Sequence, residues 1–450
     1  MELPSDRYAS QVVDVLRDLV RIDTTNPPGN ETPAGDYLAK LLLPAGVETE
    51  VIESAPGRGN LIARLRGDGS EPPLLLMGHL DVVSANPAEW RYPPFAAEIH
   101  EGFLWGRGTT DMKNMVAASA VVLLALAEAG PRLGRDVLFL ATADEEHGGR
   151  LGIGWLARER PELFRVACAL NEGGGETVRA GERTYWTCQT AEKGVCRTVW
   201  TAHGPGGHAA RPRADIATAA LSKAVASLGD GHLTPRVTRT MATALGIMAA
   251  AGISADAEEA VSAHLASGRV EEALRAVGFD ETAAERARAL FYDTVSVTGL
   301  RSGDPESINV IAPTAVAYAD GRLLPGQTDR DLLAAIRQRT GDDLEVEVYR
   351  QQYSPGLESS SDHPIFRVIS DVIAERCDGA RVIPWMTAGS TDAKHLVPAG
   401  VPVYGFVPVP PLTEGLKGAD SHAVDERLWL EGLPFTLRVL YDVVYRFCHI

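Results

Sequence analysis

The segment Leu74–Asp81, in which large apolar residues give way to glycine, histidine and aspartate, constrains the fold more than any other part of the chain. Its apolar run is long enough for a buried strand and too short to cross a membrane. Such a strand is typical of a parallel sheet covered on both faces, which binds ligands at the carboxyl ends of its strands. His79 and Asp81 would share one face there, where a carboxylate commonly orients a metal-binding imidazole. A polar loop with one structural histidine explains this segment alone equally well.

The same pattern recurs twice along the chain. The apolar run Asp136–Ala141 ends in Thr142-Ala-Asp-Glu-Glu146, and the run Val166–Leu170 ends in Asn171-Glu-Gly-Gly174. Each run therefore leads into acidic and small residues. This repetition indicates a parallel α/β sheet with a site at one edge.

The pattern changes near Lys193. Val195–Ala202, Val310–Gly321 and Leu344–Tyr349 read as strands, and a helical pattern covers Asp329–Arg339. Alternating strands with helices on one face are typical of a separate α+β domain.

We therefore expect an α/β protein with one interrupted catalytic domain. This domain would comprise residues 1–192 and 353–450 and would contain a mixed, mostly parallel sheet flanked by helices. The inserted α+β domain would comprise residues 193–352, including a long Ala-rich helical region at Val237–Arg288.

Composition excludes several classes of partner. The 450 residues carry a net charge of −17, which argues against nucleic acid and anionic membranes as partners. We see no secretory signal at the N-terminus, and the apolar segment Val116–Ala129 is too short to span a bilayer. The odd number of cysteines and the absence of a C-x-x-C pair do not resemble a disulfide framework, so a reducing cytoplasm is expected.

Five stretches of the chain offer metal-ligand chemistry. Most of them follow or flank a predicted strand end, and together they supply two histidines and several carboxylates with no thiolate: His79, Asp111, Glu145-Glu146, Glu172 and His422. This donor set suits zinc, cobalt or manganese better than a structural Cys-rich zinc site does.

These residues carry a family resemblance. The chain resembles the co-catalytic zinc metallopeptidases, which include glutamate carboxypeptidase, acetylornithine deacetylase, succinyl-diaminopimelate desuccinylase and the aminoacylases. The similarity covers most of the chain, and the motifs occur in the family's order: Gly78-His-Leu-Asp81, Gly106-Arg-Gly-Thr-Thr-Asp-Met-Lys113, Asp144-Glu-Glu146, Asn171-Glu-Gly-Gly174 and Ser421-His422.

The resemblance implies a site for two divalent metal ions, most simply zinc, with cobalt or manganese as alternatives. His79 and Glu172 would hold one ion, Glu146 and His422 the other, and Asp111 would bridge them. Two ions about 3.5 Å apart can share a water and lower its pKa from about 16 towards 7.

Two further carboxylates take roles by the same resemblance. Asp81 would orient His79, and Glu145 would be the general base that takes the proton of the shared water and passes it to the leaving amine. Glu145 could otherwise be a solvated neighbour of a ligand.

The resemblance also implies a homodimer formed through the inserted domain. His208 would reach the partner subunit's active site and stabilise an oxyanion, unless it is only a loop histidine. Asn309 and Arg322 match positions that contact substrate. The guanidinium of Arg322 could bind a substrate carboxylate or form a surface salt bridge.

In the catalytic domain, Gly389, Ser390 and Thr391 resemble the family's Gly-Gly-Thr substrate loop. Ser390 replaces its second glycine, which makes the backbone less permissive there.

The leading hypothesis is a metal-dependent hydrolase that cleaves an amide bond of a peptide with a free C-terminal carboxylate. An N-acyl-amino-acid deacylase is the alternative within the same class, and both would act on a small molecule or peptide. A non-catalytic metal- or peptide-binding protein is a remoter possibility. A serine hydrolase and a nucleotide-binding protein are disfavoured, because the sequence has no G-x-S-x-G elbow and no P-loop.

Overall fold

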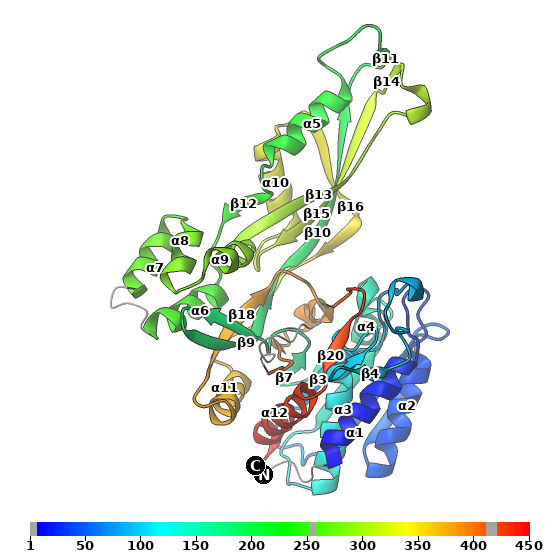
Figure 1. Ribbon diagram of the computed structural model, residues 1–450, viewed down its shortest axis with the longest axis vertical. Helices are drawn as coiled ribbons and strands as arrows, with labels where there is room; N and C mark the ends of the chain where they lie inside the picture. The colour runs from blue at the N-terminus through cyan, green and yellow to red at the C-terminus, as the bar shows by residue number, and fades with distance from the viewer. Residues whose placement is uncertain (1–6, 252–256, 411–420) are drawn as a thin grey trace.

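A computed structural model describes residues 7–251, 257–410 and 421–450. Figure 1 shows an elongated molecule with a sheet-and-helix body at one end and a second sheet at the other. The C-terminus lies at the outer end of the body. Among the described helices, none has the length and hydrophobicity needed to span a bilayer.

The body contains a mixed ten-stranded sheet. Its central strands β6, β3, β7 and β19 pair in parallel, and most of the remaining pairs are antiparallel. The predicted mixed sheet is thus confirmed, but it is not mostly parallel, because five of the nine pairs among the described strands are antiparallel. The strands in sheet order are β1 Glu48–Glu53, β2 Gly59–Leu65, β6 Val137–Thr142, β3 Leu74–His79, β7 Cys168–Asn171, β19 Val403–Gly405, β9 Arg183–Glu192 and β17 Leu357–Glu358, with β18 Arg381–Thr387 and β8 Thr177–Ala180 also paired to β9.

Helices cover both faces of this sheet, as alternate residues of β3 show. Leu74 and Leu76 belong to the apolar core on one face, whereas Leu75 and Met77 belong to the core on the other. All these side chains are buried, as expected for a central parallel strand. The helices that contribute to the first core are α1 Arg7–Arg21, α2 Thr32–Leu42, α3 Lys113–Ala129, α11 Pro364–Arg376 and α12 Gly432–Cys448, and α4 Ile153–Glu159 contributes to the second.

The second sheet is antiparallel throughout. Its strand order is β12 His232–Pro235, β13 Tyr292–Ser302, β15 Thr314–Leu323, β10 Gly194–His203 and β16 Leu344–Ser354. Burial alternates along β15, because α5 (Ala217–Ser227) and α10 (Asp329–Thr340) cover only one face. At the far tip, β11 (Gly207–His208) pairs with β14 (Val310–Ile311) (Figure 1).

In its described residues, the Ala-rich region forms four helices, and they pack on the body. Its helices share an apolar core with Tyr185 of β9 and with Ile383 and Met386 of β18. The helices are α6 Arg239–Ala250, α7 Ala257–Ala266, α8 Val270–Ala276 and α9 Glu281–Arg288. This part of residues 193–352 therefore packs on the edge of the ten-stranded sheet, and the two-domain division of the chain stays a prediction.

A small three-stranded sheet corrects one expected boundary. Strand β20 (Arg427–Trp429) pairs with β5 (Phe103–Trp105), which pairs with β4 (Glu98–His100). The sequence predicts a last helix over Leu428–Phe447, but α12 begins only at Gly432, because Leu428 belongs to strand β20. Leu428 lies opposite Leu104, and its buried side chain packs in the body core.

Candidate metal centre and active site

His79 stands at the end of β3 with a buried side chain. Its Nδ1 lies 2.9 Å from the backbone oxygen of Asp81, and its Nε2 lies 3.0 Å from Oδ1 of Asp111 and 3.7 Å from Oε2 of Glu172. A proton on Nδ1, donated to that carbonyl, leaves Nε2 free to bind a cation. Sequence reasoning assigned the orienting contact to the Asp81 carboxylate, whose Oδ1 is 3.6 Å from Nδ1.

Asp111 lies between the two predicted histidine ligands. Its second oxygen, Oδ2, is 3.2 Å from Nε2 of His422, so its two oxygens face different histidines. This is the arrangement that a carboxylate bridging two ions requires, and His422 comes from a segment more than 300 residues away along the chain.

The loop that presents Asp111 is built around the buried carboxylate of Glu426. This carboxylate accepts hydrogen bonds from Arg107 Nη1 at 2.6 Å and from the backbone nitrogens of Gly108 and Thr110 at 3.0 and 2.8 Å. Glu426 follows His422 by four residues, so its carboxylate holds together the two segments that carry the predicted ligands Asp111 and His422. Sequence reasoning did not identify this residue, because its partners are distant in the chain.

Glu145 and Glu146 occupy a single helical turn, η3 (Glu145–His147), after strand β6. The Asp81 carboxylate accepts hydrogen bonds from both backbone nitrogens, at 3.0 Å from Glu145 and 3.2 Å from Glu146. The Glu146 carboxylate then lies 3.1 Å from Nε2 of His422. Asp81 therefore fixes the turn that places these two glutamates in different positions.

Two overlapping groups of side chains have the spacing of a metal site. His79, Glu145 and Glu172 form one group, and His79, Asp111 and Glu146 form the other, with all ligand atoms of a group within 4.8 Å of one another. Glu145 faces the same space as the predicted ligand Glu172. Imidazole and carboxylate donors in this number fit divalent first-row cations.

The electrostatics of the cluster favour bound cations. Burial and the Glu172 carboxylate raise the pKa of Glu145 well above its usual value, and burial raises the pKa of Glu146 to about 7. Hydrogen bonding to Asp111 raises the pKa of His422 to about 9. Several carboxylates crowded together in a buried site repel one another, and divalent cations would offset this repulsion.

Lys394 is a further charged residue of the site that sequence reasoning missed. Its Nζ is 3.7 Å from Oε1 of Glu145 and 3.8 Å from Oδ1 of Asp392, and its side chain is 13% exposed. The ammonium group offsets part of the negative charge near the predicted base. No local pattern in the sequence signals this contact.

The predicted substrate loop reaches the ends of two strands. Thr391 Oγ1 donates to Oε1 of Glu192 at 2.6 Å and accepts from Asn171 Nδ2 at 2.9 Å. Asn171 immediately precedes the predicted ligand Glu172, whereas Gly389 is exposed and Ser390 is partly exposed. The loop is thus anchored beside the metal centre through Thr391.

The predicted residues of the second sheet are not brought to the metal centre within this chain. His208 is exposed on β11, and the neighbouring Ala209 nitrogen donates to the backbone oxygen of Asn309 at 2.9 Å. His208 belongs to β11 and Asn309 directly precedes β14, and these two strands lie at the tip that points away from the body (Figure 1). Arg322, on β15, donates from Nε to Oδ1 of Asp320 at 2.6 Å. The roles predicted for His208, Asn309 and Arg322 stay predictions. Each would need a partner subunit, or closure of the second sheet over the body, to reach a metal centre.

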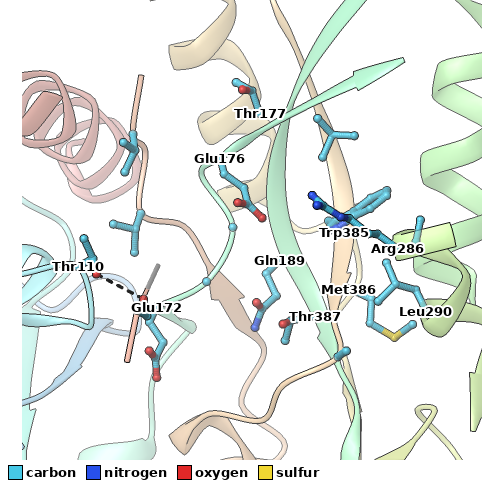
Figure 2. Close-up of a pocket in the computed structure, with 18 of the residues that line it drawn as sticks. Thr110, Glu172, Glu176, Thr177, Gln189, Arg286, Leu290, Trp385, Met386 and Thr387 are labelled. Atoms are coloured by element: carbon cyan, nitrogen blue, oxygen red, sulfur yellow. Dashed lines mark hydrogen bonds between the residues drawn. The ribbon is translucent and has the colours of Figure 1, made fainter. Parts of the chain in front are cut away.

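A cavity of about 890 Å³ opens beside the metal centre. Asp111 and Glu172 line it together with residues of α9 and β18. Figure 2 shows Glu172 at one side of this cavity and Trp385 and Leu290 at the other.

Known proteins resemble this chain in both sequence and fold. The N-fatty-acyl-amino acid synthase/hydrolase PM20D1 of Xenopus tropicalis is 26% identical over 468 residues, which span 98% of this chain and 86% of that protein. A succinyl-diaminopimelate desuccinylase of Methylobacterium sp. (strain 4-46) is 39% identical over 213 residues, spanning 44% of this chain and only 50% of that protein.

Solved structures share the fold over nearly the whole chain. The M20 family metallo-carboxypeptidase Sso-CP2 from Sulfolobus solfataricus matches with a TM-score of 0.68 at 19% identity, covering 96% of this chain and 98% of that one. Human carnosine dipeptidase 1 matches with a TM-score of 0.66 at 17% identity, covering 98% and 97%.

The sequence profile of Peptidase family M20/M25/M40 matches residues 75–446, a span that includes every predicted metal ligand. The expected resemblance, fold class and enzyme class are therefore confirmed. The chain belongs to Peptidase family M20/M25/M40 and is a metallo-hydrolase, whose described His, Asp and Glu side chains form two overlapping groups that could hold metal ions.

Proposed function

We propose that this enzyme hydrolyses the amide bond of a peptide with a free C-terminal carboxylate and releases an amino acid from it. The observation that carries the proposal is the convergence of two histidines and four carboxylates from distant segments at one edge of the sheet, with Asp111 between His79 and His422. Zinc is the simplest occupant, and cobalt or manganese would suit the same donors.

The metal ions, when bound, supply an acidified water and a Lewis acid. Glu145 is the group that takes the proton of that water, because its carboxylate faces the shared space of His79 and Glu172. Burial, which raises its pKa, also suits a group that must later give the proton to the leaving amine. Lys394 stands behind Glu145 and holds an opposing charge there.

The side chains of the second sheet complete the proposed site from a partner subunit. His208 of a second copy would donate a hydrogen bond to the oxyanion, and Asn309 and Arg322 would contact the substrate. Support comes from their match to the family's motifs and from the exposure of His208 at the molecule's tip.

An N-acyl-amino-acid deacylase is the second candidate. It is favoured by the relative that spans nearly the whole chain, an N-fatty-acyl-amino acid synthase/hydrolase, and by the partly apolar cavity beside the centre. Both candidates release an amino acid with a free carboxylate and differ only in the group on the acyl side of the bond.

A substrate panel tests the proposal. The zinc-loaded enzyme is assayed on dipeptides, on N-acyl amino acids and on the C-terminal amides of both, with a chelated sample as the control. Hydrolysis restricted to free carboxylates supports the proposal, and preference for dipeptides or N-acyl amino acids separates the two candidates. Equal hydrolysis of acids and amides would contradict the role of the carboxylate.

A further inference from the structure

The helical segment α6–α9 is fixed to the metal-binding sheet by specific contacts. Thr240 at the start of α6 donates from its backbone nitrogen to Glu358 at 2.7 Å, and its hydroxyl lies 3.0 Å from that of Thr190 on β9. At the other end of the segment, the buried Lys193 donates from Nζ to the backbone oxygen of Ala289 at 3.0 Å. The segment is therefore held against the same sheet that carries the metal centre.

This docking closes one side of the cavity with apolar side chains. Phe279 and Trp385 stack with ring centroids 6.4 Å apart and planes 3° apart, which joins the segment to β18 across the wall. The apolar residues of this wall come from β8, the segment around α9, and β18: Val178, Phe279, Ala287, Leu290, Trp385 and Met386.

The side chains that line the cavity change in polarity along its length. Its metal end is lined by Asp111 and Glu172, whereas its far side is lined by Trp385, Met386 and Leu290 together with the charged Arg286, as Figure 2 shows for the labelled residues. An apolar wall that ends at a catalytic centre binds a substrate whose apolar part extends away from the reacting bond. The size lies within the range of cavities that enclose small organic ligands.

We infer that residues 279–290, which include α9, form with β18 a binding site for a long apolar acyl group, which extends from the metal centre to Trp385 and Leu290. The inference rests on the second candidate function, an N-acyl-amino-acid deacylase, because the long apolar group takes the acyl side of the amide bond that is cut. Each methylene buried on the apolar wall should strengthen binding by roughly threefold to fourfold until the cavity is filled.

The first test uses N-acylglycines from acetyl to dodecanoyl with the zinc-loaded full chain. We expect kcat/KM to rise with acyl length and then level off. Ala283→Trp, a lining position on α9, should lower the ratio of dodecanoyl to acetyl kcat/KM by at least tenfold, and Thr282→Trp provides a second lining variant. Glu285→Trp is the matched control, because Glu285 is exposed on the same helix and does not line the cavity.

Two results would overturn the inference: no dependence on acyl length in the wild type, or an unchanged ratio in both lining variants when they fold normally. A preference for shorter acyl chains in the lining variants would support the inference, provided that Glu285→Trp keeps the wild-type preference.

A binding experiment separates this inference from the proposed function. The fluorescence of the metal-loaded protein is titrated with dodecanoate and with acetate, and Trp385→Phe identifies the part of the signal that comes from Trp385. Saturable binding of dodecanoate that is sensed by Trp385 and weakened by Ala283→Trp supports the apolar site, even if every amide resists hydrolysis and the proposed function fails. Hydrolysis of amides without any such binding would retain the proposed function and reject the apolar site.

Discussion

The metal centre and the tip of the second sheet differ in one respect: the predicted residues of the metal centre meet within one chain, whereas those of the tip do not reach a site in the same chain. His79 is 2% exposed and its ring contacts the groups that would share its ion, whereas His208 is exposed at the opposite end of the molecule. The parallel strands β3, β6 and β7 end at one edge, so their terminal residues meet without any further partner. The tip has no equivalent constraint, and its predicted role depends on assembly.

Removal of the metal ions should have the largest effect, because it disables the region that the chain completes by itself. Exhaustive chelation is expected to reduce hydrolysis by more than about a thousandfold, and zinc or cobalt should restore it. Hydrolysis and metal content are measured on the same samples. Full activity in protein shown to contain no metal would show that hydrolysis does not depend on the metal centre.

Glu145→Gln should be nearly as damaging, but for a different reason. The amide cannot take a proton from the water, so kcat is expected to fall by about a hundredfold to ten-thousandfold while both ions stay bound. Turnover and bound metal are measured together.

Glu146→Gln serves as the comparison for that variant, because Glu146 faces His422 and is a predicted ligand. It should lose metal as well as activity. Normal turnover in Glu145→Gln would show that another group is the base.

The sequence predicts those parts of the metal centre whose residues form a recognisable pattern within a short stretch of the chain. The apolar runs of β3, β6 and β7 and the acidic residues after them are visible as patterns, and the structure brings these residues together. Glu426 and Lys394 carry no such signal, because their contacts join segments far apart in the chain. Their importance appears only once the chain is folded.

Strand β9 shows why one central element was missed. It contains buried polar residues such as Thr187, Gln189 and Thr190, so it shows neither an apolar run nor alternation. Partners outside the strand make their burial possible: the Thr187 hydroxyl donates to the backbone oxygen of Glu176 at 3.1 Å, and the Thr190 hydroxyl pairs with that of Thr240 on α6. A sequence pattern cannot reveal such partners in advance.

His208→Ala should have a smaller effect than Glu145→Gln and tests whether assembly completes the site. Loss of one oxyanion donor is expected to lower kcat by about a hundredfold to a thousandfold. Mixing this variant with Glu145→Gln should then restore activity, because each hybrid dimer contains one site with both Glu145 and the partner's His208.

Random exchange of subunits would give roughly a quarter of the wild-type rate. The rate is measured before and after exchange, with chromatography to confirm the dimer. Hybrid dimers as inactive as their parents would place His208 outside the partner's site.

Arg322→Ala should have the smallest effect, because this residue acts on binding and already has a partner in the chain. Asp320 accepts from Nε and Nη2 of Arg322, which leaves Nη1 available to a substrate carboxylate. We expect the KM of substrates with a free carboxylate to rise about tenfold, and the KM of their amides to change little. Arg197→Ala is the matched control, since Arg197 contacts the same Asp320 from 3.5 Å and is more exposed. If Arg197→Ala raised the KM as much as Arg322→Ala, the effect would come from the charge of this face, and the second sheet would attract substrate without recognising its carboxylate.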